Sequence, residues 1–271
     1  MSYRRKHIKP KIRGMRPKKK FWQRQVFWFA LFFLLMACAG AYFILFLPDI
    51  QVENIQVSGN HTIHAEAIEG IAKKSIRKNL FPAGLITITS ESMVVVNTAE
   101  LEQLIAEAFP SIKEVRVRKK WPRGIIIEIV EREAVALFCE ETDGSVCFHM
   151  DEEGVIFQEA QPDGSLPVIR KAKDAPAQEG NRAVQTQTMG AIITIANLLK
   201  EQFQVAITEV LVSNPIVISA SEGWKLYLDP DEPAAAQAAK LQTLLASQIP
   251  PQARKQLQYI YLQYKDRAYY K

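Results

Sequence analysis

One stretch of the chain lacks the alternation of apolar and polar positions that marks the rest. Val26 to Leu47 is a run of 22 residues without a charged side chain. At roughly 1.5 Å per residue, a helix of this length reaches about 33 Å, close to the ~30 Å hydrocarbon core of a bilayer. A helix also satisfies its own backbone hydrogen bonds, as lipid requires. The pattern predicts a transmembrane helix at 26–47, in contact with the lipid bilayer.

After this run the pattern changes to short segments that predict an α+β unit in the order strand, helix, helix, strand, strand. Two helices on one face of a three-stranded sheet can bury one small core, with Val115 and Val117 turned to the helices and Arg116 and Arg118 to water. Residues 79–97 between the helices contain short β-prone pieces, 85–89 and 93–96, that remain ambiguous. The predicted elements are Ile50 to Val57, a helix after Thr62, Ala99 to Phe109, Lys113 to Lys119 and Ile125 to Val130.

From Glu131 onward strands dominate, and the spacing predicts a mainly antiparallel β domain with two helices, 185–202 and 234–248. Turn-forming residues separate short strands on both sides of the first helix. The domain organisation predicted from the whole chain is a basic tail at 1–25, the transmembrane helix at 26–47, an α+β domain at 48–131 and the β domain at 132–271.

Charge is distributed very unevenly along the chain. Residues 1–25 hold eleven Lys or Arg and no acidic residue, whereas the remainder holds 23 basic and 29 acidic residues, a net charge of −6. A basic segment before a membrane helix stays in the cytoplasm, so the residues after the helix are expected outside it. A basic surface over the whole fold is excluded, and we expect no nucleic-acid partner, although a basic tail alone can attract phosphate.

The apolar run has two alternative interpretations in which the chain is cleaved: a signal peptide and a lipoprotein signal. A cleaved signal peptide has a shorter apolar region of about 7–15 residues. The residues Leu35 to Ala39 resemble a lipoprotein signal with Cys38 as the modified residue, but Ala39 to Leu47 stays apolar where a lipoprotein has a polar tether. The sequence therefore favours a helix that is kept.

The sequence contains no G-x-S-x-G motif and no phosphate-binding loop. Three groups have some of the chemistry of a site, and each has a simpler interpretation. His61 and His64 open a helix without further metal ligands nearby. The acidic turn 229–232 could contact Ca²⁺, but its prolines favour a solvated turn. Glu131 and Glu133 could act as paired carboxylates, but with Arg132 between them a solvated strand end is the simpler interpretation. We therefore expect no enzyme activity, no metal, no cofactor and no small-molecule substrate.

Cys139 and Cys147 lie on the two strands of a predicted hairpin. If its loop is the three residues 142–144, the two cysteines face each other, and a disulfide can form outside the cytoplasm. Two small buried apolar side chains are the alternative, and a different loop register would exclude the bond.

The last predicted strand, Gln258 to Tyr270, holds five of the eight tyrosines. Alternation puts Tyr259, Tyr261, Gln263 and Lys265 on one face, and Ile260, Leu262, Tyr264 and Asp266 on the other, more aliphatic face. Tyrosine offers apolar area together with a hydroxyl, and an edge strand can accept a further strand. The predicted partner-binding residues are Tyr259, Tyr261, Gln263, Tyr264 and Lys265, although these tyrosines can also simply close the β domain.

Several short motifs follow one another along the chain in a recognisable order. The residues 57–60 resemble the start of a POTRA module. The residues 109–112, 115–117 and Trp121-Pro122 resemble its second helix and hairpin. The residues 131–136 resemble a Glu-Arg-x-Pro-x-Ala motif, with Ala134 for the Pro. The pieces 151–157, 166–167, 223–228 and 259–271 resemble the β domain.

Together these motifs resemble the bacterial cell-division family FtsQ/DivIB. The resemblance implies a single-pass, non-enzymatic scaffold at the division septum. It would bind division proteins of the FtsB/DivIC and FtsL types through the C-terminal strand. Two departures bear on this: residues 79–97 are longer than the usual loop, and 260–264 read Ile-Tyr-Leu-Gln-Tyr where the family often has Ile-Asp-Leu-Arg-Tyr.

Two other classes of protein remain as alternatives. A POTRA-bearing assembly or translocation factor would precede an outer-membrane barrel, for which the region after residue 131 is too short. A membrane-anchored extracytoplasmic hydrolase would need a nucleophile or metal constellation.

Overall fold

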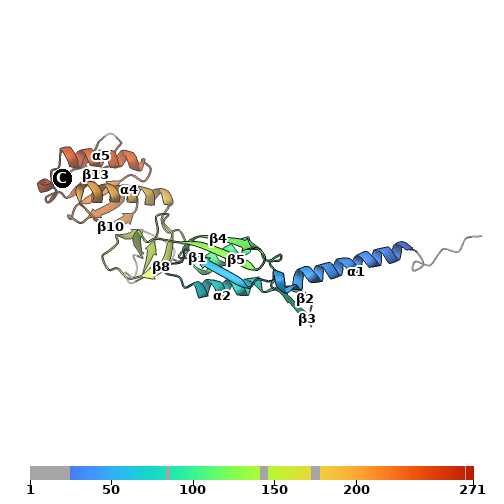
Figure 1. Ribbon diagram of the computed structural model, residues 1–271. Helices are drawn as coiled ribbons and strands as arrows, with labels where there is room; N and C mark the ends of the chain where they lie inside the picture. The colour runs from blue at the N-terminus through green and yellow to red at the C-terminus, as the bar shows by residue number, and fades with distance from the viewer. Residues whose placement is uncertain (1–24, 84–85, 141–145, 172–177, 266) are drawn as a thin grey trace, which may run out of the picture.

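The computed structural model of the protein describes residues 25–83, 86–140, 146–171, 178–265 and 267–271. Figure 1 shows an elongated chain with α1 (Gln25–Phe46) at one end. A three-stranded sheet with two helices follows, and a nine-stranded sheet with further helices forms the other end. We call the elements from β1 to β5 the proximal domain and those from β6 to β14 the distal domain. The basic tail with Trp22 lies outside the described residues.

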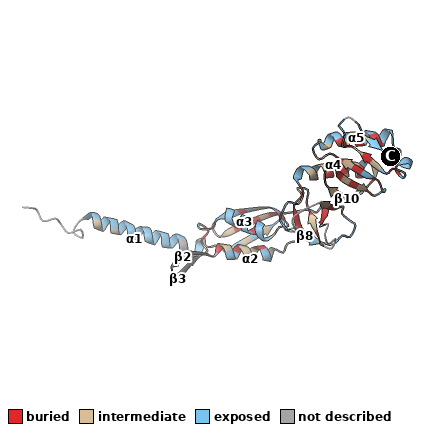
Figure 2. Cartoon of the chain, turned by 180° about the vertical axis from the view of Figure 1, so that it is seen from behind, coloured by how far each residue is buried: buried red, intermediate tan, exposed pale blue. Residues whose placement is uncertain are grey.

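The helix α1 is long and apolar enough between Gln25 and Ile44 to cross a membrane. Its boundaries differ by one residue at each end from the predicted run. Figure 2 shows it exposed along most of its length, whereas the buried residues gather in the two sheet domains. Because a water-exposed helix of this composition would be costly, the one candidate span in the described part of the chain suggests a single-pass membrane protein.

The proximal domain has the predicted order of elements and the sheet order β1-β5-β4. β1 runs parallel to β5, and β5 runs antiparallel to β4. Val117 is buried and Val115 half-buried against the helices, while Arg116 and Arg118 are exposed, so the predicted register is confirmed. The elements are β1 (Asn54–Ser58), α2 (Ala65–Ile76), α3 (Thr98–Ala108), β4 (Ile112–Lys120) and β5 (Gly124–Glu131).

Between α2 and α3 the chain forms an additional antiparallel hairpin, β2 (Lys78–Ala83) and β3 (Ile86–Ser90). This hairpin is a separate two-stranded sheet. The segment after it, predicted as β-prone at 93–96, is a turn whose Met93 and Val96 enter the core of the proximal domain. Burial of these two apolar side chains explains the apolar pattern without a strand.

The distal domain is built on one mixed sheet with the order β14-β13-β12-β11-β10-β9-β6-β7-β8. β9 pairs in parallel with both β10 and β6 and so joins the two halves of the sheet, whereas most other pairs are antiparallel. The strands are β6 (Ala136–Cys139), β7 (Cys147–Met150), β8 (Ile156–Ala160), β9 (Val168–Lys171), β10 (Ile207–Val212), β11 (Ile216–Ala220), β12 (Lys225–Leu228), β13 (Tyr259–Tyr261) and β14 (Tyr269–Tyr270).

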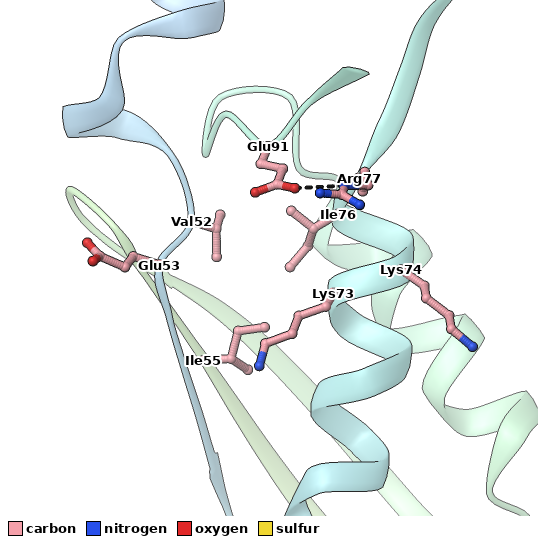
Figure 3. A pocket seen from close by; sticks show the side chains of 8 residues that line it. All are labelled: Val52, Glu53, Ile55, Lys73, Lys74, Ile76, Arg77 and Glu91. Carbon is pink, nitrogen blue, oxygen red and sulfur yellow. Dashed lines mark hydrogen bonds and ion pairs between the residues drawn. The ribbon is translucent and has the colours of Figure 1, made fainter. Parts of the chain in front are cut away.

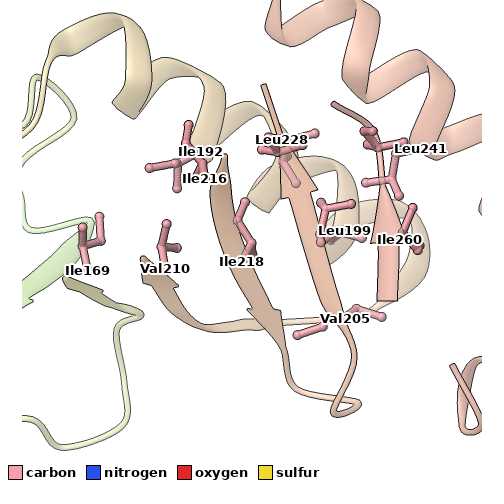
Figure 4. Packing of buried hydrophobic residues seen from close by; sticks show 14 of the residues in the cluster. Ile169, Ile192, Leu199, Val205, Val210, Ile216, Ile218, Leu228, Leu241 and Ile260 are labelled. Atoms are coloured by element: carbon pink, nitrogen blue, oxygen red, sulfur yellow. The ribbon is translucent and has the colours of Figure 1, made fainter. Parts of the chain in front are cut away.

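Three helices complete the distal domain: α4 (Thr186–Phe203), α5 (Ala234–Ser247) and the short α6 (Pro251–Arg254). Side chains from α4 and α5 meet those of the strands in one apolar core, part of which is drawn in Figure 4. Leu199 and Leu241 come from the helices, and Ile218 and Ile260 from the sheet; all four are fully buried.

Cys139 and Cys147 face each other in the register of β6 and β7, and a disulfide joins them. The loop residues 142–144, on which the sequence argument depended, lie outside the described residues.

The predicted continuous strand from Gln258 to Tyr270 is wrong. The chain leaves the strand after Tyr261, turns, and returns as β14, which pairs antiparallel with β13. Lys240 on α5 explains the break, because its Nζ donates to the carbonyl oxygens of Leu262 at 3.4 Å and Tyr264 at 3.0 Å. These carbonyl groups are turned toward the helix instead of toward a neighbouring strand.

Candidate partner-binding surface

The nine-stranded sheet ends in two edge strands that differ in what lies beside them. Beyond β8, the chain around 178–183 adds backbone bonds: Ile156 N–H donates to the Asn181 carbonyl at 3.0 Å, and Gly180 N–H to the Ile156 carbonyl at 2.7 Å. At the opposite edge, β14 pairs with β13 and is the last strand in the order. The β14 edge is therefore the one at which a further strand can be added.

The direction of the backbone groups on β14 follows from its register. Opposed residues in an antiparallel pair alternate between exchanging hydrogen bonds and not exchanging them. Lys271 N–H donates to the Tyr259 carbonyl at 3.2 Å, and Tyr259 N–H to the Lys271 carbonyl at 3.4 Å. Tyr270, opposite Ile260, is consequently in a non-bonded pair, and its N–H and C=O are directed to the free edge.

Tyrosines gather beside this edge in what we call the tyrosine cluster. The rings of Tyr227 and Tyr261 have centroids 4.5 Å apart, and those of Tyr259 and Tyr261 are 4.8 Å apart. Tyr264 meets Tyr269 edge-on at 5.5 Å. Its members are Tyr227, Tyr259, Tyr261, Tyr264 and Tyr269.

The register of the sheet explains why the cluster forms. Ile260 and Leu262 are fully buried in the core, so alternation turns Tyr259 and Tyr261 to the other face. β12 runs parallel to β13 and places Tyr227 directly beside Tyr261. Burial among these neighbours raises the pKa of Tyr261 above its usual value, and the electrostatic effect of Tyr227 is the second contribution to this rise. The hydroxyl therefore remains a neutral donor and acceptor over the ordinary pH range.

The five predicted partner-binding residues do not all lie where alternation placed them. Tyr259, Tyr261 and Gln263 are half-buried, whereas Tyr264 and Lys265 are exposed. Tyr264, which was predicted to cover the core, is 46% exposed because the strand ends before it. The sequence prediction did not include Tyr227. Its place between Leu226 and Leu228, which are buried, indicates by alternation that its side chain lies on the face opposite the core.

The three groups weighed as catalytic or metal sites have structural roles or lie on the surface. His61 and His64 are exposed, and His64 is the N-cap residue of α2. Asp229 accepts a hydrogen bond from Asp231 N–H at 2.9 Å within its turn. No group of three or more metal-ligating side chains occurs among the residues that the structure describes.

Glu131 lies at the end of β5 and fixes the loop before α2. Its carboxylate accepts hydrogen bonds from the backbone N–H groups of His61 at 2.8 Å, Thr62 at 3.0 Å and Ile63 at 3.1 Å. Partial burial acts to raise its pKa, but these three bonds outweigh burial and hold the pKa below its usual value. Glu131 is thus an ionised structural anchor.

The next residue, Arg132, connects the two domains. Its guanidinium pairs with Asp151 and donates to the Pro110 carbonyl at 3.2 Å. Asp151 is only 2% exposed, and its second oxygen accepts from the N–H groups of Glu153 and Val155, each at 2.9 Å. In the motif that resembled Glu-Arg-x-Pro-x-Ala, the first residue, Glu131, therefore fixes the loop before α2. The second residue, Arg132, connects the proximal domain to the distal domain.

Comparison with known proteins gives a match to one family model and to two relatives. The model of the POTRA domain, FtsQ-type, matches residues 50–132. A cell division protein FtsQ of Corynebacterium glutamicum is 23% identical over 205 residues, which cover 74% of this chain and 81% of the relative. A cell division protein FtsQ of Streptomyces coelicolor is 26% identical over 171 residues, covering 63% of this chain and 54% of the relative.

Proposed function

From the premise that the comparisons support an FtsQ-type cell-division protein of the FtsQ/DivIB family, we propose that the chain is a non-enzymatic scaffold of the division machinery. Its distal domain binds a division protein of the FtsB/DivIC type, together with one of the FtsL type, in support of septum formation. The observation that carries the proposal is the open β14 edge with the tyrosine cluster beside it.

Strand addition explains how such an edge recognises a partner. The backbone groups of Tyr270 supply hydrogen bonds to an incoming strand, and neighbouring side chains supply selectivity. Tyr264, Tyr269 and Tyr270 are each 46% exposed. Tyrosines of this kind contribute large apolar area at little conformational cost, which is why they dominate many binding surfaces.

The proposed topology puts the basic tail in the cytoplasm and both domains outside it. The support is the eleven cationic residues before α1, because short basic segments are retained on the cytoplasmic side. A reporter enzyme that works only outside the cytoplasm is expected to be active when fused after Lys271 and inactive when fused before Met1. The reverse result would overturn the orientation.

A matched pair of substitutions at Tyr270 tests the partner edge. Tyr270→Pro removes the N–H directed to the free edge without removing a bond to β13, while Tyr270→Ala keeps that N–H. The full chain in detergent is titrated with the FtsB/DivIC-type protein from the same genome. We expect Tyr270→Pro to weaken binding roughly tenfold or more, about 1.4 kcal/mol, and Tyr270→Ala to weaken it less.

Thermal unfolding followed by circular dichroism shows whether both variants keep their fold. Binding by Tyr270→Pro that equals binding by the parent chain would place the partner elsewhere. Equal losses in both variants would assign recognition to the side chain and exclude strand addition.

A further inference from the structure

The parallel pairing of β12 with β13 stops at a defined point. In a parallel ladder, every second residue directs both its N–H and its C=O to the neighbouring strand. Lys225 N–H donates to the Gln258 carbonyl at 3.0 Å. Leu262 N–H donates to the Tyr227 carbonyl at 2.9 Å. By this register, the next bond would run from Asp229 N–H to the Leu262 carbonyl.

Side chains of α5 take both groups that would form this bond. Asp229 N–H donates to Gln237 Oε1 at 3.0 Å, and Gln237 Nε2 donates to the Asp229 carbonyl at 2.8 Å. Lys240 Nζ donates to the carbonyl groups of Leu262 at 3.4 Å and Tyr264 at 3.0 Å. Gln237 and Lys240 are three residues apart and so lie on one face of the helix. One face of α5 therefore ends the ladder between β12 and β13.

A carboxylate fixes Lys240 in this position. Lys240 Nζ lies 2.8 Å from Glu232 Oε1, and the two side chains are only 22% and 9% exposed. One carboxylate and two carbonyl groups use the three N–H donors of the ammonium group. The carbonyl of Glu232 also accepts a hydrogen bond from Gln237 Nε2 at 3.1 Å. The acidic turn 229–232 therefore belongs to the contacts that end the ladder.

Apolar packing keeps these side chains of α5 over the sheet. Leu241, the residue after Lys240, is fully buried in the same core as Ile260 of β13, as Figure 4 shows. Movement of α5 away from β13 would expose this apolar surface to water, which costs free energy. Lys240 therefore acts from a helix that is fixed in place.

The end of β13 determines where β14 can form. Tyr261, the last residue of β13, lies opposite Tyr269 of β14. The chain therefore has to turn directly after Tyr261 in order to return in this register. The carbonyl groups of Leu262 and Tyr264 set this point, because a carbonyl bound by a side chain is not available to a continuing strand.

We propose that Lys240, supported by Gln237 and Glu232, is a positioning residue for partner recognition. Lys240 acts through the backbone. It ends β13 after Tyr261 and so holds the returning chain where β14 presents the N–H and C=O of Tyr270 at the free edge. The proposal rests on the function proposed above for the β14 edge and names the residue on which that edge depends.

Substitutions at Lys240 and Glu232 in the full chain in detergent test the proposal. Lys240→Met keeps the apolar stem of the side chain and removes its three donors. The double variant Lys240→Met with Glu232→Gln removes the same donors without leaving a largely buried carboxylate unpaired, and it is used if the single variant loses its unfolding transition. Glu232→Gln alone keeps the two bonds from Lys240 to carbonyl groups.

Lys73→Met is the matched control, because Lys73 is also a helical lysine paired with a carboxylate. Figure 3 shows its side chain on α2, beside a cavity of about 370 Å³ between α2 and β1. Lys73 Nζ is 3.2 Å from Glu69, and its side chain is 64% exposed. This lysine belongs to the proximal domain and binds no backbone group of the distal domain.

Two measurements are made on every variant. The first is amide hydrogen exchange of the segment 258–271, where the N–H groups of Gln258, Tyr259 and Lys271 are bonded between β13 and β14. The second is the titration with the FtsB/DivIC-type protein that is used for Tyr270. We expect both Lys240 variants to exchange these amides roughly tenfold faster and to bind roughly tenfold more weakly. Glu232→Gln should show smaller changes and Lys73→Met none, while exchange in α4 stays constant throughout.

The two measurements separate this inference from the proposed function. Exchange at the parent rate in both Lys240 variants would overturn the inference, and the Tyr270 pair would still test the β14 edge by itself. Faster exchange with unchanged affinity would confirm that Lys240 forms β14 and would overturn the function proposed for that edge. Losses as large in Glu232→Gln as in Lys240→Met would assign the effect to the ion pair and overturn the role of the two carbonyl groups.

Discussion

The two ends of the proximal domain are joined to their neighbours by different chemistry. At the distal end, Arg132 and Asp151 form an ion pair whose side chains are only 14% and 3% exposed. At the end that faces α1, Arg123 pairs with Asp49 and Glu53, whose side chains are 73% and 64% exposed. Both ends use one arginine, but only one of the pairs is removed from water.

This difference in solvent exposure determines how much each junction resists change. An exposed ion pair contributes about 0–1 kcal/mol, because water and salt screen it. Removal of one partner from a buried pair leaves an uncompensated charge and costs about 3–5 kcal/mol. The ion pair at the distal junction is therefore expected to contribute more to stability than the ion pairs at the junction with α1.

Loss of the buried arginine has the largest expected effect. Arg132→Ala leaves Asp151 without its cation and is expected to lower stability by about 3–5 kcal/mol. Thermal unfolding of the full chain in detergent measures the change. The double variant Arg132→Ala with Asp151→Asn should recover part of it, and a loss below about 1 kcal/mol for the single variant would show that this pair behaves as an exposed one.

Glu131 gives an intermediate effect that depends on pH. Its pKa is lower in the folded protein than the ordinary value of 4.5, so its stabilising contribution is complete above that value and is lost as the pH falls through the folded pKa. Glu131→Gln is expected to cost about 1–2 kcal/mol at neutral pH, after allowance for partial exposure, and progressively less below pH 4.5.

Glu133→Gln is the matched control for this prediction, because Glu133 is exposed on the same segment. Its melting temperature should follow that of the parent chain at every pH. A constant difference between Glu131→Gln and the parent chain across the acid range would refute the assignment.

The smallest effect is expected at the end that faces α1. Arg123→Gln should change stability by less than about 1 kcal/mol, and added salt should shrink the difference further. If Arg123→Gln lowered stability as much as Arg132→Ala does, the ion pairs at the two ends of the proximal domain would contribute equally, and the comparison would be wrong.

Local patterns were sufficient to predict α1 and the order of elements in the proximal domain. Both depend on neighbours in sequence: an uncharged apolar run, or apolar positions at a fixed period. The β-prone piece 85–89 corresponds to β3, but its partner β2 escaped prediction because it is short and contains Pro82, which is unfavourable inside a strand.

The contacts that fix the loop before α2 and those that shape the site depend on residues far apart in the chain. Glu131 binds backbone groups 68 to 70 residues away, and Lys240 ends β13 from a helix 22 and 24 residues earlier. The sequence alone does not distinguish a carboxylate at a strand end that is solvated by water from one that accepts hydrogen bonds from three backbone amide groups. Tyr227 joins the tyrosine cluster only through the parallel register of β12 and β13.

The pairing of β1 with β5 has a mechanical consequence. α1 leads into the start of β1, and the distal domain follows the end of β5, while the two strands run parallel through five opposed pairs from Asn54–Gly124 to Ser58–Glu128. Tension between the bilayer and a partner held at β14 would act along both strands in opposite directions. All five pairs would then bear the load together in shear, instead of opening one after another.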